Sequence, residues 1–282
     1  MIELSKKITS NVARVNAQYG LIKENDRVMV GFSGGKDSLT LIHTLNRMKK
    51  KAPFKFDFKA VTVTYGMGEQ VEFLSSHCKE HGIEHEIIDT QIFDLAGEKI
   101  RKNSSFCSFF SRMRRGYLYT TALEQGYNKV ALGHHLDDAM ESFFMNLFYN
   151  GTMRTMPPIY KANNGLEVIR PLIFCRERQL RAFANSNEIR VIGDEACPGL
   201  RFDVKMPHAR ATTKELLAKL EEQNPKIFVS MKSAFSNIQL PTFFYENLKD
   251  IKLDLEDENI WKSLFHRVFW VKIADLMVRI QA

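Results

Sequence analysis

The sequence is organised around the stretch Gly31-Phe32-Ser33-Gly34-Gly35-Lys36-Asp37-Ser38. It follows a short apolar run at 27–30 and precedes apolar residues at helical spacing from Leu39 to Met48. We therefore predict a buried strand, a glycine-rich turn and a helix. Two adjacent glycines let the backbone turn sharply and approach a ligand closely, and the amides at the start of the helix attract an anion. With two serine hydroxyls and the charge of Lys36, this turn is predicted to bind phosphate.

The loop differs from the common nucleotide P-loop, which has four spacer residues between its first glycine and Gly-Lys-Ser/Thr. Here the two glycines stand side by side directly before the lysine. The string Ser33-Gly34-Gly35-Lys36-Asp37-Ser38 resembles instead the pyrophosphate loop of the ATP-pyrophosphatase superfamily. The resemblance implies an enzyme that binds ATP through these six residues, cleaves it between the α and β phosphates and adenylates a substrate oxygen. The alternative is a glycine turn whose lysine is merely solvated.

The composition favours one large domain and a polyanionic partner. The chain has 282 residues, a formal net charge of +7 and a pI near 9.1, and excess basic charge suits nucleic acid. No apolar run approaches the about twenty residues needed to cross a bilayer, and the N-terminus lacks the apolar segment of a signal peptide. We therefore expect a soluble, cytoplasmic protein with no membrane partner. Its four widely spaced cysteines do not predict structural disulfides there.

Segments with the patterns of strands and helices alternate along the first 200 residues. Strands are expected at 27–30, 54–64, 84–88, 129–132, 166–169 and 191–192, with a loop at 150–164. This alternation predicts an α/β fold with a doubly wound parallel sheet, whose ligands bind at the carboxyl ends of the strands. We expect a lead-in helix in residues 1–20, the main domain in 21–200 and a helical C-terminal extension in 201–282. Within that extension, the amphipathic run 260–280 either docks on the main domain or forms a dimer or partner surface.

A second strand-end turn, Gly133-His134-His135-Leu136-Asp137-Asp138, holds paired carboxylates. Carboxylates at a strand end are well placed to hold Mg²⁺ against phosphate oxygens, so we assign Mg²⁺ to Asp137 and Asp138 and a catalytic role to Asp138. The alternative is an aspartate that caps the next helix, and one residue can do both. A transition-metal site at the two histidines ranks below the magnesium–nucleotide interpretation.

Five stretches occur in an order that resembles the tRNA 2-thiocytidine synthetases, relatives of lysidine synthetase among the pyrophosphate-loop enzymes. They are Ser33–Ser38, Cys107-Ser108-x-x-Ser111-Arg112-Met113-Arg114-Arg115-Gly116, Leu132–Asp138, Met156-Pro157-Pro158 and Arg170-Pro171-Leu172. The resemblance covers residues 1 to about 240 and implies the adenine nucleotide alpha hydrolase-like (HUP-type) fold. It implies an enzyme that adenylates the C2 oxygen of an anticodon-loop cytidine and releases pyrophosphate. Sulfur then displaces AMP to give 2-thiocytidine.

The remaining nucleotide and base contacts are expected around these turns. Ala60, Val61, Thr62, Gly133 and His134 are expected to line the adenosine pocket, with backbone amides that read the base. The residue expected to steady the adenylated base is Arg114; a solvated helix arginine is the alternative.

The sulfur half of the predicted site departs from the family pattern. The resemblance implies an iron–sulfur cluster on three cysteines, of which Cys107 matches the first and Cys197 the third. Phe110 stands at the second position, and phenylalanine cannot ligate iron. The family also usually carries an acid near Thr64. Cys78 is expected to be buried filler, and Cys175 is not taken as a ligand.

Three interpretations stay open at this point. The chain is a diverged thiolase, which binds its cluster differently or passes sulfur between Cys107 and Cys197 as a persulfide; its sulfur donor is expected to be a desulfurase or sulfide. It is an ATP-dependent tRNA modifier that uses another nucleophile, such as an amine. Or it is a weakened relative that only binds nucleotide or tRNA.

Basic residues cluster around the predicted strand ends and are expected to contact tRNA phosphates, which makes binding weaken with salt. They include Arg101, Lys102, Arg112, Arg115, Arg154, Lys161, Arg170, Arg176 and Arg178. For each one alone, a solvated surface role is the alternative. A tRNA whose target base can be flipped into the pocket suits such a site.

Overall fold

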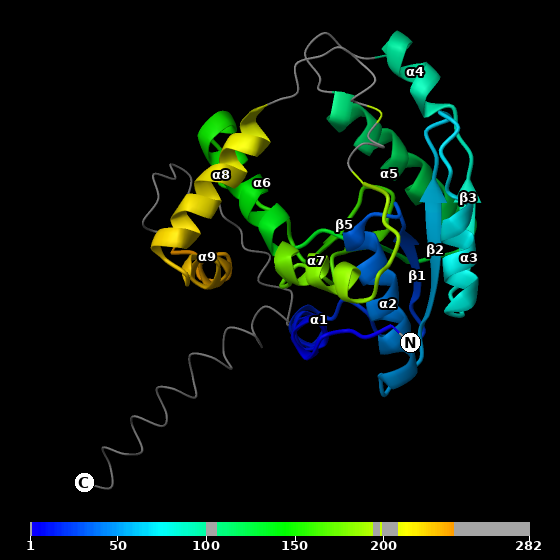
Figure 1. Cartoon of the computed structure of the whole chain (residues 1–282), viewed down its shortest axis with the longest axis horizontal. Helices are drawn as coiled ribbons and strands as arrows, with labels where there is room; N and C mark the ends of the chain where they lie inside the picture. The colour runs from blue at the N-terminus through cyan, green and yellow to red at the C-terminus, as the bar shows by residue number, and fades with distance from the viewer. Residues whose placement is uncertain (1, 100–105, 194–197, 199–207, 240–282) are drawn as a thin grey trace, which may run out of the picture. The chain divides into compact units, whose positions relative to one another are not determined.

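The computed structural model describes residues 2–99, 106–193, 198 and 208–239 (Figure 1). The chain divides into two compact units, residues 1–232 and 233–282. The predicted helix at 260–280 lies outside the described residues, so the structure tests neither of its two expected roles. The boundaries predicted at residues 20 and 200 stay predictions, although the first compact unit extends to Lys232.

Six strands and nine helices are described in these ranges. The strands are β1 (Arg27–Gly31), β2 (Asp57–Val63), β3 (His85–Ile88), β4 (Lys129–Ala131), β5 (Ile159–Lys161) and β6 (Glu167–Ile169). The helices are α1 (Lys6–Tyr19), α2 (Lys36–Lys51), α3 (Glu72–Glu80), α4 (Ile92–Lys99), α5 (Phe106–Glu124), α6 (Leu136–Asn150), α7 (Glu177–Ser186), α8 (His208–Gln223) and α9 (Ile227–Ala234).

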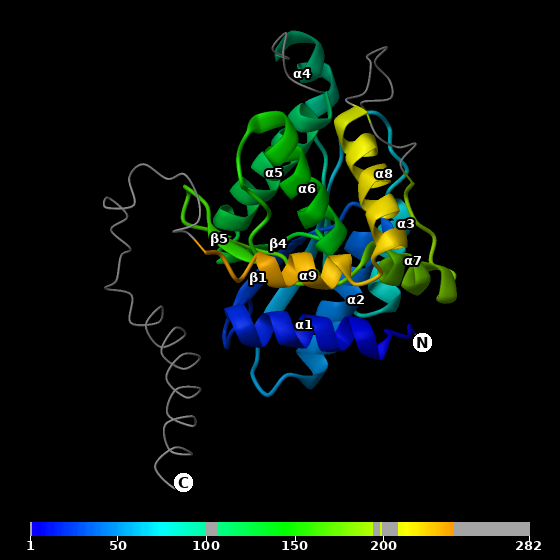
Figure 2. The ribbon, with the colours of Figure 1, turned by 90° about the vertical axis from the view of Figure 1, so that its left-hand side faces the viewer.

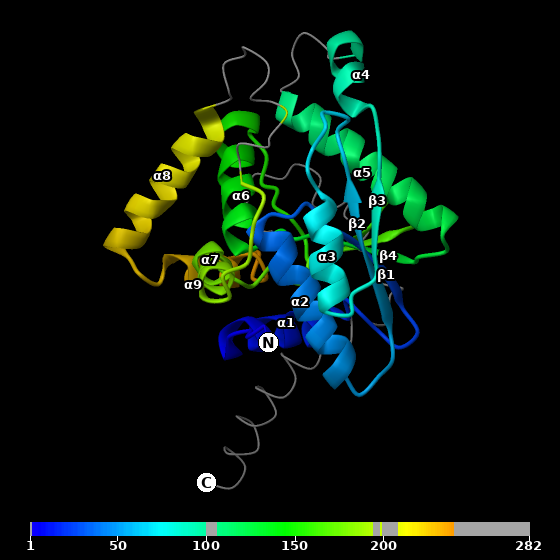
Figure 3. The same cartoon turned by 45° about the vertical axis from the view of Figure 1, so that its right-hand side comes forward.

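The strands form one sheet in the order β3-β2-β1-β4-β6-β5, parallel except for β5. Figure 3 shows α2 and α3 on one side of the sheet and α5 on the other. The sheet is covered on both faces, which explains why the side chains of Val28, Met29 and Val30 in β1 are fully buried. The predicted doubly wound α/β fold is confirmed.

The strand order reverses at β1, which has β2 on one side and β4 on the other. Val30 pairs with Ala60 of β2 and with Ala131 of β4, so these strands end close together. Ligands of such sheets bind beyond the carboxyl ends of the strands at the reversal point. The topology therefore brings the turn after β1 next to the turn after β4.

Three local predictions differ from the structure. Residues 191–192 form no strand, because the Ile192 amide donates to the Gly34 carbonyl oxygen (2.9 Å) instead of to a sheet neighbour. The segment predicted as a loop at 150–164 contains β5, which pairs antiparallel with β6. Helix α4 was not predicted.

Helix α8 belongs to the same compact unit as the sheet and packs against α6 (Figure 2). The Arg210 side chain of α8 donates to Glu141 of α6 (2.8 Å). None of the helices in the described ranges combines the length and the apolar character needed to cross a bilayer.

Phe110 lies in an aromatic part of the core, where its side chain is only 2% exposed. Its ring lies 5.5 Å from that of Tyr65, 5.6 Å from that of Phe109 and 6.3 Å from that of Phe93, between ring centroids. The residue at the expected second cysteine position is therefore a packing residue that joins α5 to the segments after β2 and β3.

Phe110→Ala is expected to lower the free energy of unfolding by about 3–5 kcal/mol, because it removes a buried ring and leaves a cavity. Urea unfolding followed by circular dichroism measures the change. Phe148→Ala is the matched control, since the Phe148 side chain is 56% exposed. Equal stability of the two variants would contradict the packing role.

Candidate active site

The loop after β1 has the geometry of an anion site. The Ser33 amide donates to Ser38 Oγ (3.2 Å), and Ser38 Oγ donates to the Gly35 carbonyl oxygen (3.0 Å). Gly34 has a φ of +78°, and a Cβ there would lie 2.7 Å from Ile192 Cδ1, so the turn requires glycine. Gly35 is the N-cap residue of α2, and no side chain caps the helix there. The first amides of α2 are therefore available to an anion.

A cavity of about 880 Å³ opens between this loop, the turn after β4 and helices α5 and α8. One part of its lining is apolar and comes from Val61, Val63, Leu118 and Leu132. Another part carries charged and hydroxyl groups: Ser33, Lys36, Asp37, Ser38, Asp138, Glu141, Glu177, Arg210 and Lys214. The cavity can therefore hold a ligand that has an apolar ring system at one end and phosphates at the other.

The turn after β4 contacts the phosphate loop directly. A Cβ added at Gly133 would lie 3.3 Å from both the Asp37 carbonyl carbon and the Ser38 nitrogen. The His135 amide donates to Asp138 Oδ2 (3.0 Å), and the Asp138 amide donates to His135 Nδ1 (3.4 Å), a reciprocal cap of α6. Asp138 thus caps its helix, as one of the two sequence alternatives predicted, and also lines the cavity, while its role in holding Mg²⁺ stays a prediction.

Two carboxylates in the cavity could hold a cation. Asp37 Oδ1 is buried and accepts no hydrogen bond from the described residues. Burial raises the pKa of Asp37, the charge of Asp138 raises it further, and His135 and Lys36 act in the opposite direction. A buried carboxylate oxygen without a donor fits a bound cation. Asp138 Oδ1 instead accepts from Arg210 Nη2 (2.6 Å).

Asp137 does not line the cavity. Its carboxylate accepts from Arg176 Nε (3.0 Å) and from the Glu177 amide (2.7 Å), which ties α6 to the start of α7. Of the two aspartates predicted to hold magnesium, the fold brings only Asp138 to the phosphate loop, where its partner is Asp37.

The Glu177 side chain lines the cavity and forms ion pairs with three basic side chains. Its oxygens lie 3.3 Å from Lys36 Nζ, 2.9 Å from Lys214 Nζ and 3.0 Å from Arg181 Nη2. Burial acts to raise the pKa of Glu177, but these cations, Lys214 foremost, lower it to about 2. Burial likewise acts to lower the pKa of Lys36, and Asp37 and Glu177 outweigh it and raise that pKa.

The Glu177 carboxylate makes part of the stability dependent on pH. Because its pKa is lower in the folded protein than the ordinary 4.5, its contribution is present above about pH 4.5 and is lost as the pH falls to about 2. Glu177→Gln should therefore lose less unfolding free energy over that interval than the parent protein. Urea unfolding at several pH values measures this, with Glu124→Gln at an exposed site as control. Parallel pH profiles of parent and Glu177→Gln would contradict it.

His134 and Arg114, the residues predicted to lie near the bound bases, both line the cavity. Arg170 Nε donates to His134 Nδ1 (3.3 Å), so the neutral ring carries its proton on Nε2. Burial and Arg170 lower the pKa of His134 to about 4. Arg114 Nη1 donates to Tyr65 Oη (2.7 Å), with its guanidinium 4.9 Å from the Tyr65 ring centroid. Both Arg114 and Tyr65 line the cavity.

The run 60–62 contributes less to the cavity than predicted. Val61 lines it, but Ala60 and Thr62 do not. The Ala60 amide already donates to the Glu84 carbonyl oxygen (2.8 Å), and Thr62 Oγ1 donates to the Phe32 carbonyl oxygen (2.7 Å). The Ala60 amide and the Thr62 hydroxyl are therefore engaged within the sheet and are not free to read a base.

The arginines predicted to bind tRNA divide into two groups. Arg112 and Arg154 are exposed and Arg115 is half-buried. Arg170 is buried, where it donates to the Pro157 carbonyl oxygen (2.7 Å). Arg176 pairs with Asp137 and with Glu221 (2.6 Å), and its guanidinium lies 3.3 Å from the Phe228 ring centroid. Arg170 thus ties the turn after β4 to the segment before β5, and Arg176 ties the start of α7 to α6, α8 and α9.

The cysteines predicted to handle sulfur cannot be placed: Cys197 and the side chain of Cys107 lie outside the described residues. Cys78 and Cys175 are fully buried, and burial raises the pKa of each thiol to about 12. Both thiols are protonated at neutral pH, and neither lines the cavity. Within the described residues, then, no third thiolate stands near the cavity.

Five polar cavity residues were not identified from the sequence: Tyr65, Glu141, Glu177, Arg210 and Lys214. Arg210 and Lys214 are four residues apart, a spacing that places both on one face of α8. That spacing predicts a basic face on this helix, but it does not show which part of the protein the face contacts.

Comparisons with known proteins identify the family of this chain. The PP-loop domain family matches residues 4–205. A tRNA-cytidine(32) 2-sulfurtransferase of Geobacter metallireducens is 42% identical over 237 residues, which cover 83% of this chain and 90% of that protein. A second protein of that name, from Pseudomonas syringae pv. syringae, is 37% identical over 252 residues, 88% of this chain and 89% of its own.

A solved structure supports the fold independently. The U34-tRNA thiolase of Methanococcus maripaludis, solved with its 4Fe-4S cluster, matches with a TM-score of 0.69 at 24% identity. The match covers 86% of this chain and 81% of that one. The predicted HUP-type fold and the predicted family resemblance are both confirmed.

Proposed function

Because the chain belongs to the PP-loop family and, within it, to the tRNA-cytidine(32) 2-sulfurtransferases, we propose that it is an ATP-dependent enzyme that converts cytidine 32 of tRNA to 2-thiocytidine. The observation that carries this proposal is the two-part cavity. Its apolar walls suit adenine, and its charged end joins a helix N-terminus to Lys36. Such a site activates a base by adenylation.

ATP would lie with its adenine against Val61 and Leu132 and its β and γ phosphates on the loop 33–38. The first amides of α2, the hydroxyls of Ser33 and Ser38 and the charge of Lys36 would bind the departing pyrophosphate. Lys36 exchanges its partner Glu177 for a phosphate oxygen, and Lys214 and Arg210 bring further positive charge from α8.

The donor set fits Mg²⁺. Asp37 and Asp138 would hold the ion, since Asp37 Oδ1, which accepts no hydrogen bond from the described residues, is a hard oxygen ligand of the kind that Mg²⁺ prefers. When bound, Mg²⁺ would neutralise charge on the phosphate oxygens. Arg210 now neutralises Asp138 and could move from the carboxylate to a phosphate.

In the first half-reaction, the C2 oxygen of the flipped cytidine attacks the α phosphorus of ATP and pyrophosphate leaves. Arg114, oriented by its hydrogen bond to Tyr65, would contact the base. Its guanidinium donors would hold the base in position for the attack.

The residues present do not fit a cluster held by three cysteines. Phe110 is packed in the core, and Cys78 and Cys175 are buried, protonated thiols. We assign sulfur transfer to Cys107 and Cys197. The terminal sulfur of a Cys107 persulfide attacks C2 and AMP leaves. The Cys197 thiolate then attacks the Cys107 sulfur, which releases the thiolated base and leaves a disulfide that an external dithiol reduces. A desulfurase would supply the sulfur by transferring the outer sulfur of its own persulfide to the Cys107 thiolate, which leaves the desulfurase cysteine as a thiolate.

The proposed function is tested with purified protein, ATP, tRNA, a desulfurase with cysteine, and a dithiol. Pyrophosphate release that depends on tRNA, together with 2-thiocytidine in the digested tRNA by mass spectrometry, is expected. A modified nucleoside that carries nitrogen in place of sulfur would indicate the amine alternative. ATP binding without pyrophosphate release would overturn the enzyme assignment.

Arg112→Ala and Arg154→Ala should each weaken tRNA binding and lower the slope of log K against log salt by about 1, because each removes one exposed phosphate contact. Fluorescence anisotropy at several salt concentrations measures both quantities. Lys51→Ala, at the end of α2 remote from the phosphate loop, is the control. Unchanged slopes in both arginine variants would place the tRNA surface elsewhere.

A further inference from the structure

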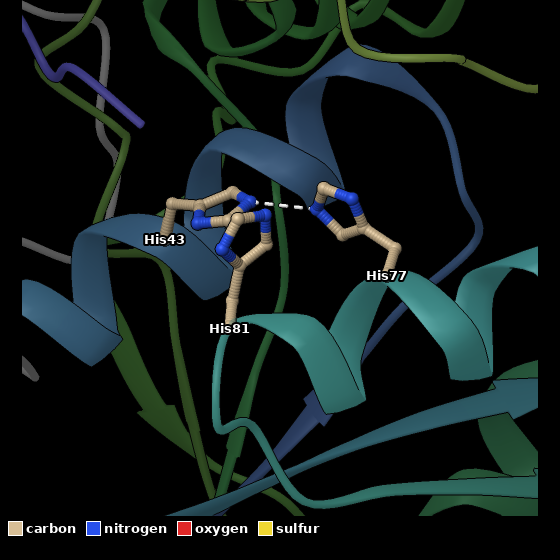
Figure 4. A group of neighbouring side chains, drawn as sticks. All are labelled: His43, His77 and His81. Atoms are coloured by element: carbon tan, nitrogen blue, oxygen red, sulfur yellow. Dashed lines mark hydrogen bonds between the residues drawn. The ribbon is translucent and has the colours of Figure 1, made fainter. Parts of the chain in front are cut away.

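Three histidines lie together between α2 and α3, apart from the ATP cavity (Figure 4). His43 comes from the middle of α2, His77 lies in α3, and His81 caps the end of α3. One ring nitrogen of each can be chosen so that all three lie within 4.8 Å of one another. The Nε2 atoms of His43 and His77 are 2.8 Å apart and share a hydrogen bond.

We propose that His43, His77 and His81 bind one Zn²⁺ ion, a site separate from the catalytic cavity. Imidazole nitrogen is a preferred zinc ligand, and three such ligands plus water complete a tetrahedral site. His77 and His81 are four residues apart and so share one face of α3. The C-terminal end of α3 also carries the partial negative charge of the helix dipole, which favours a cation.

The rings need only small movements to form this site. With Zn–N distances of about 2.0–2.1 Å, tetrahedral ligand atoms stand about 3.3 Å apart. The His43–His77 pair would open slightly and exchange its hydrogen bond for two metal bonds, while the longer separations within the group would close. The side-chain amide of Asn46 in α2 donates to the His81 carbonyl oxygen (3.0 Å), and this hydrogen bond already holds the end of α3 on α2.

The surroundings keep His43 and His77 in the form that binds metal. Burial lowers the pKa of His43 to about 3 and also lowers that of His77. Neutral imidazole is the ligating form. Lys50 opposes a cation near His43 and Glu80 favours one near His77. His43 is packed against the Phe183 ring of α7, whereas His77 and His81 are half-buried, which leaves room for a water ligand.

Zinc here would join the two helices that support the phosphate loop. Helix α2 begins at that loop, and Leu74 of α3, one turn before His77, lies 3.1 Å from where a Cβ would stand on Gly34. The ion would therefore stabilise the scaffold behind the loop without touching the nucleotide.

The test uses the full chain free of any histidine tag and dialysed against a chelator. Calorimetric titration with Zn²⁺ at neutral pH should give one ion per chain, and Mg²⁺ should give no binding at this site. At a Zn²⁺ concentration about 100 times the Kd, the Tm should rise by about 5–10 °C. His77→Gln and His81→Gln should each weaken zinc binding at least about 100-fold, since loss of a ligand exceeds the cost of losing an outer contact.

His135→Gln is the matched variant for the catalytic cavity, where His135 stands beside Asp37 and Asp138. It should keep full zinc affinity. Circular dichroism establishes that each variant is folded. Undiminished zinc binding in folded His77→Gln and His81→Gln, loss of binding in His135→Gln instead, or no zinc binding by the parent protein would each overturn the proposal.

Discussion

Asp138→Asn is expected to lower the rate of pyrophosphate release by about 100- to 1,000-fold, the loss typical when one preorganised charged group is removed from such a site. Asparagine can still accept the hydrogen bond from the His135 amide that caps α6. The fold should therefore survive while the carboxylate that faces Asp37 is lost. Release of pyrophosphate from labelled ATP, at saturating tRNA and Mg²⁺, measures the effect.

Two further variants make this result specific. Asp57→Asn removes an exposed carboxylate at the start of β2, which pairs with Lys49, and should leave the rate unchanged. Asp137→Asn should mainly lower stability, because the Asp137 carboxylate binds Arg176 and the Glu177 amide. A folded Asp137→Asn protein that lost as much activity as Asp138→Asn would show that Asp37 and Asp138 are not the metal pair.

Cys107→Ser is expected to abolish 2-thiocytidine formation while pyrophosphate release continues. The adenylation half of the reaction uses the loop 33–38 and the turn 133–138, and neither contains a cysteine. A serine hydroxyl cannot form a persulfide, so the activated base would meet no sulfur. Quantifying released pyrophosphate and 2-thiocytidine in the same reactions separates the two steps.

The control is Cys78→Ala, which removes a buried thiol on α3 and should leave thiolation intact. The parent protein should contain no iron and be colourless after anaerobic purification. Thiolation by Cys107→Ser with sulfide alone would exclude the persulfide route. Stoichiometric iron with a visible absorption band would instead show that the protein binds an iron–sulfur cluster.

The parts of the fold that the sequence predicted are those whose signals are local. The strand, turn and helix from Arg27 to Lys51 can be read from buried β-branched residues, paired glycines and helical spacing in one window. Residues 191–192 have the same local strand pattern, yet Ile192 makes its hydrogen bond with Gly34. β5 is a three-residue edge strand whose partner is set by the fold, and so has little pattern of its own.

The same limit applies to the candidate site. Asp137 and Asp138 are adjacent, and on a helix neighbouring side chains point about 100° apart. Sequence alone therefore could not say which of them faces the phosphate loop. Arg176 and Arg170 looked like phosphate ligands because they are basic and near strand ends, but each meets its partners only through the fold. Lys214 reaches the cavity from α8, far along the chain from the loop.

The absence of a side chain at Gly133 has a consequence for how the enzyme would work. Its backbone lies against the carbonyl carbon of Asp37 and the nitrogen of Ser38, so the two strand-end turns touch through main-chain atoms. A methyl group at this position would contact both atoms too closely, and the two turns would have to move apart by a few tenths of an ångström. A misplacement of about 1 Å can lower a catalytic rate about 100-fold. The distance between the phosphate loop and the Asp138 carboxylate is thus set when the chain folds, before ATP binds.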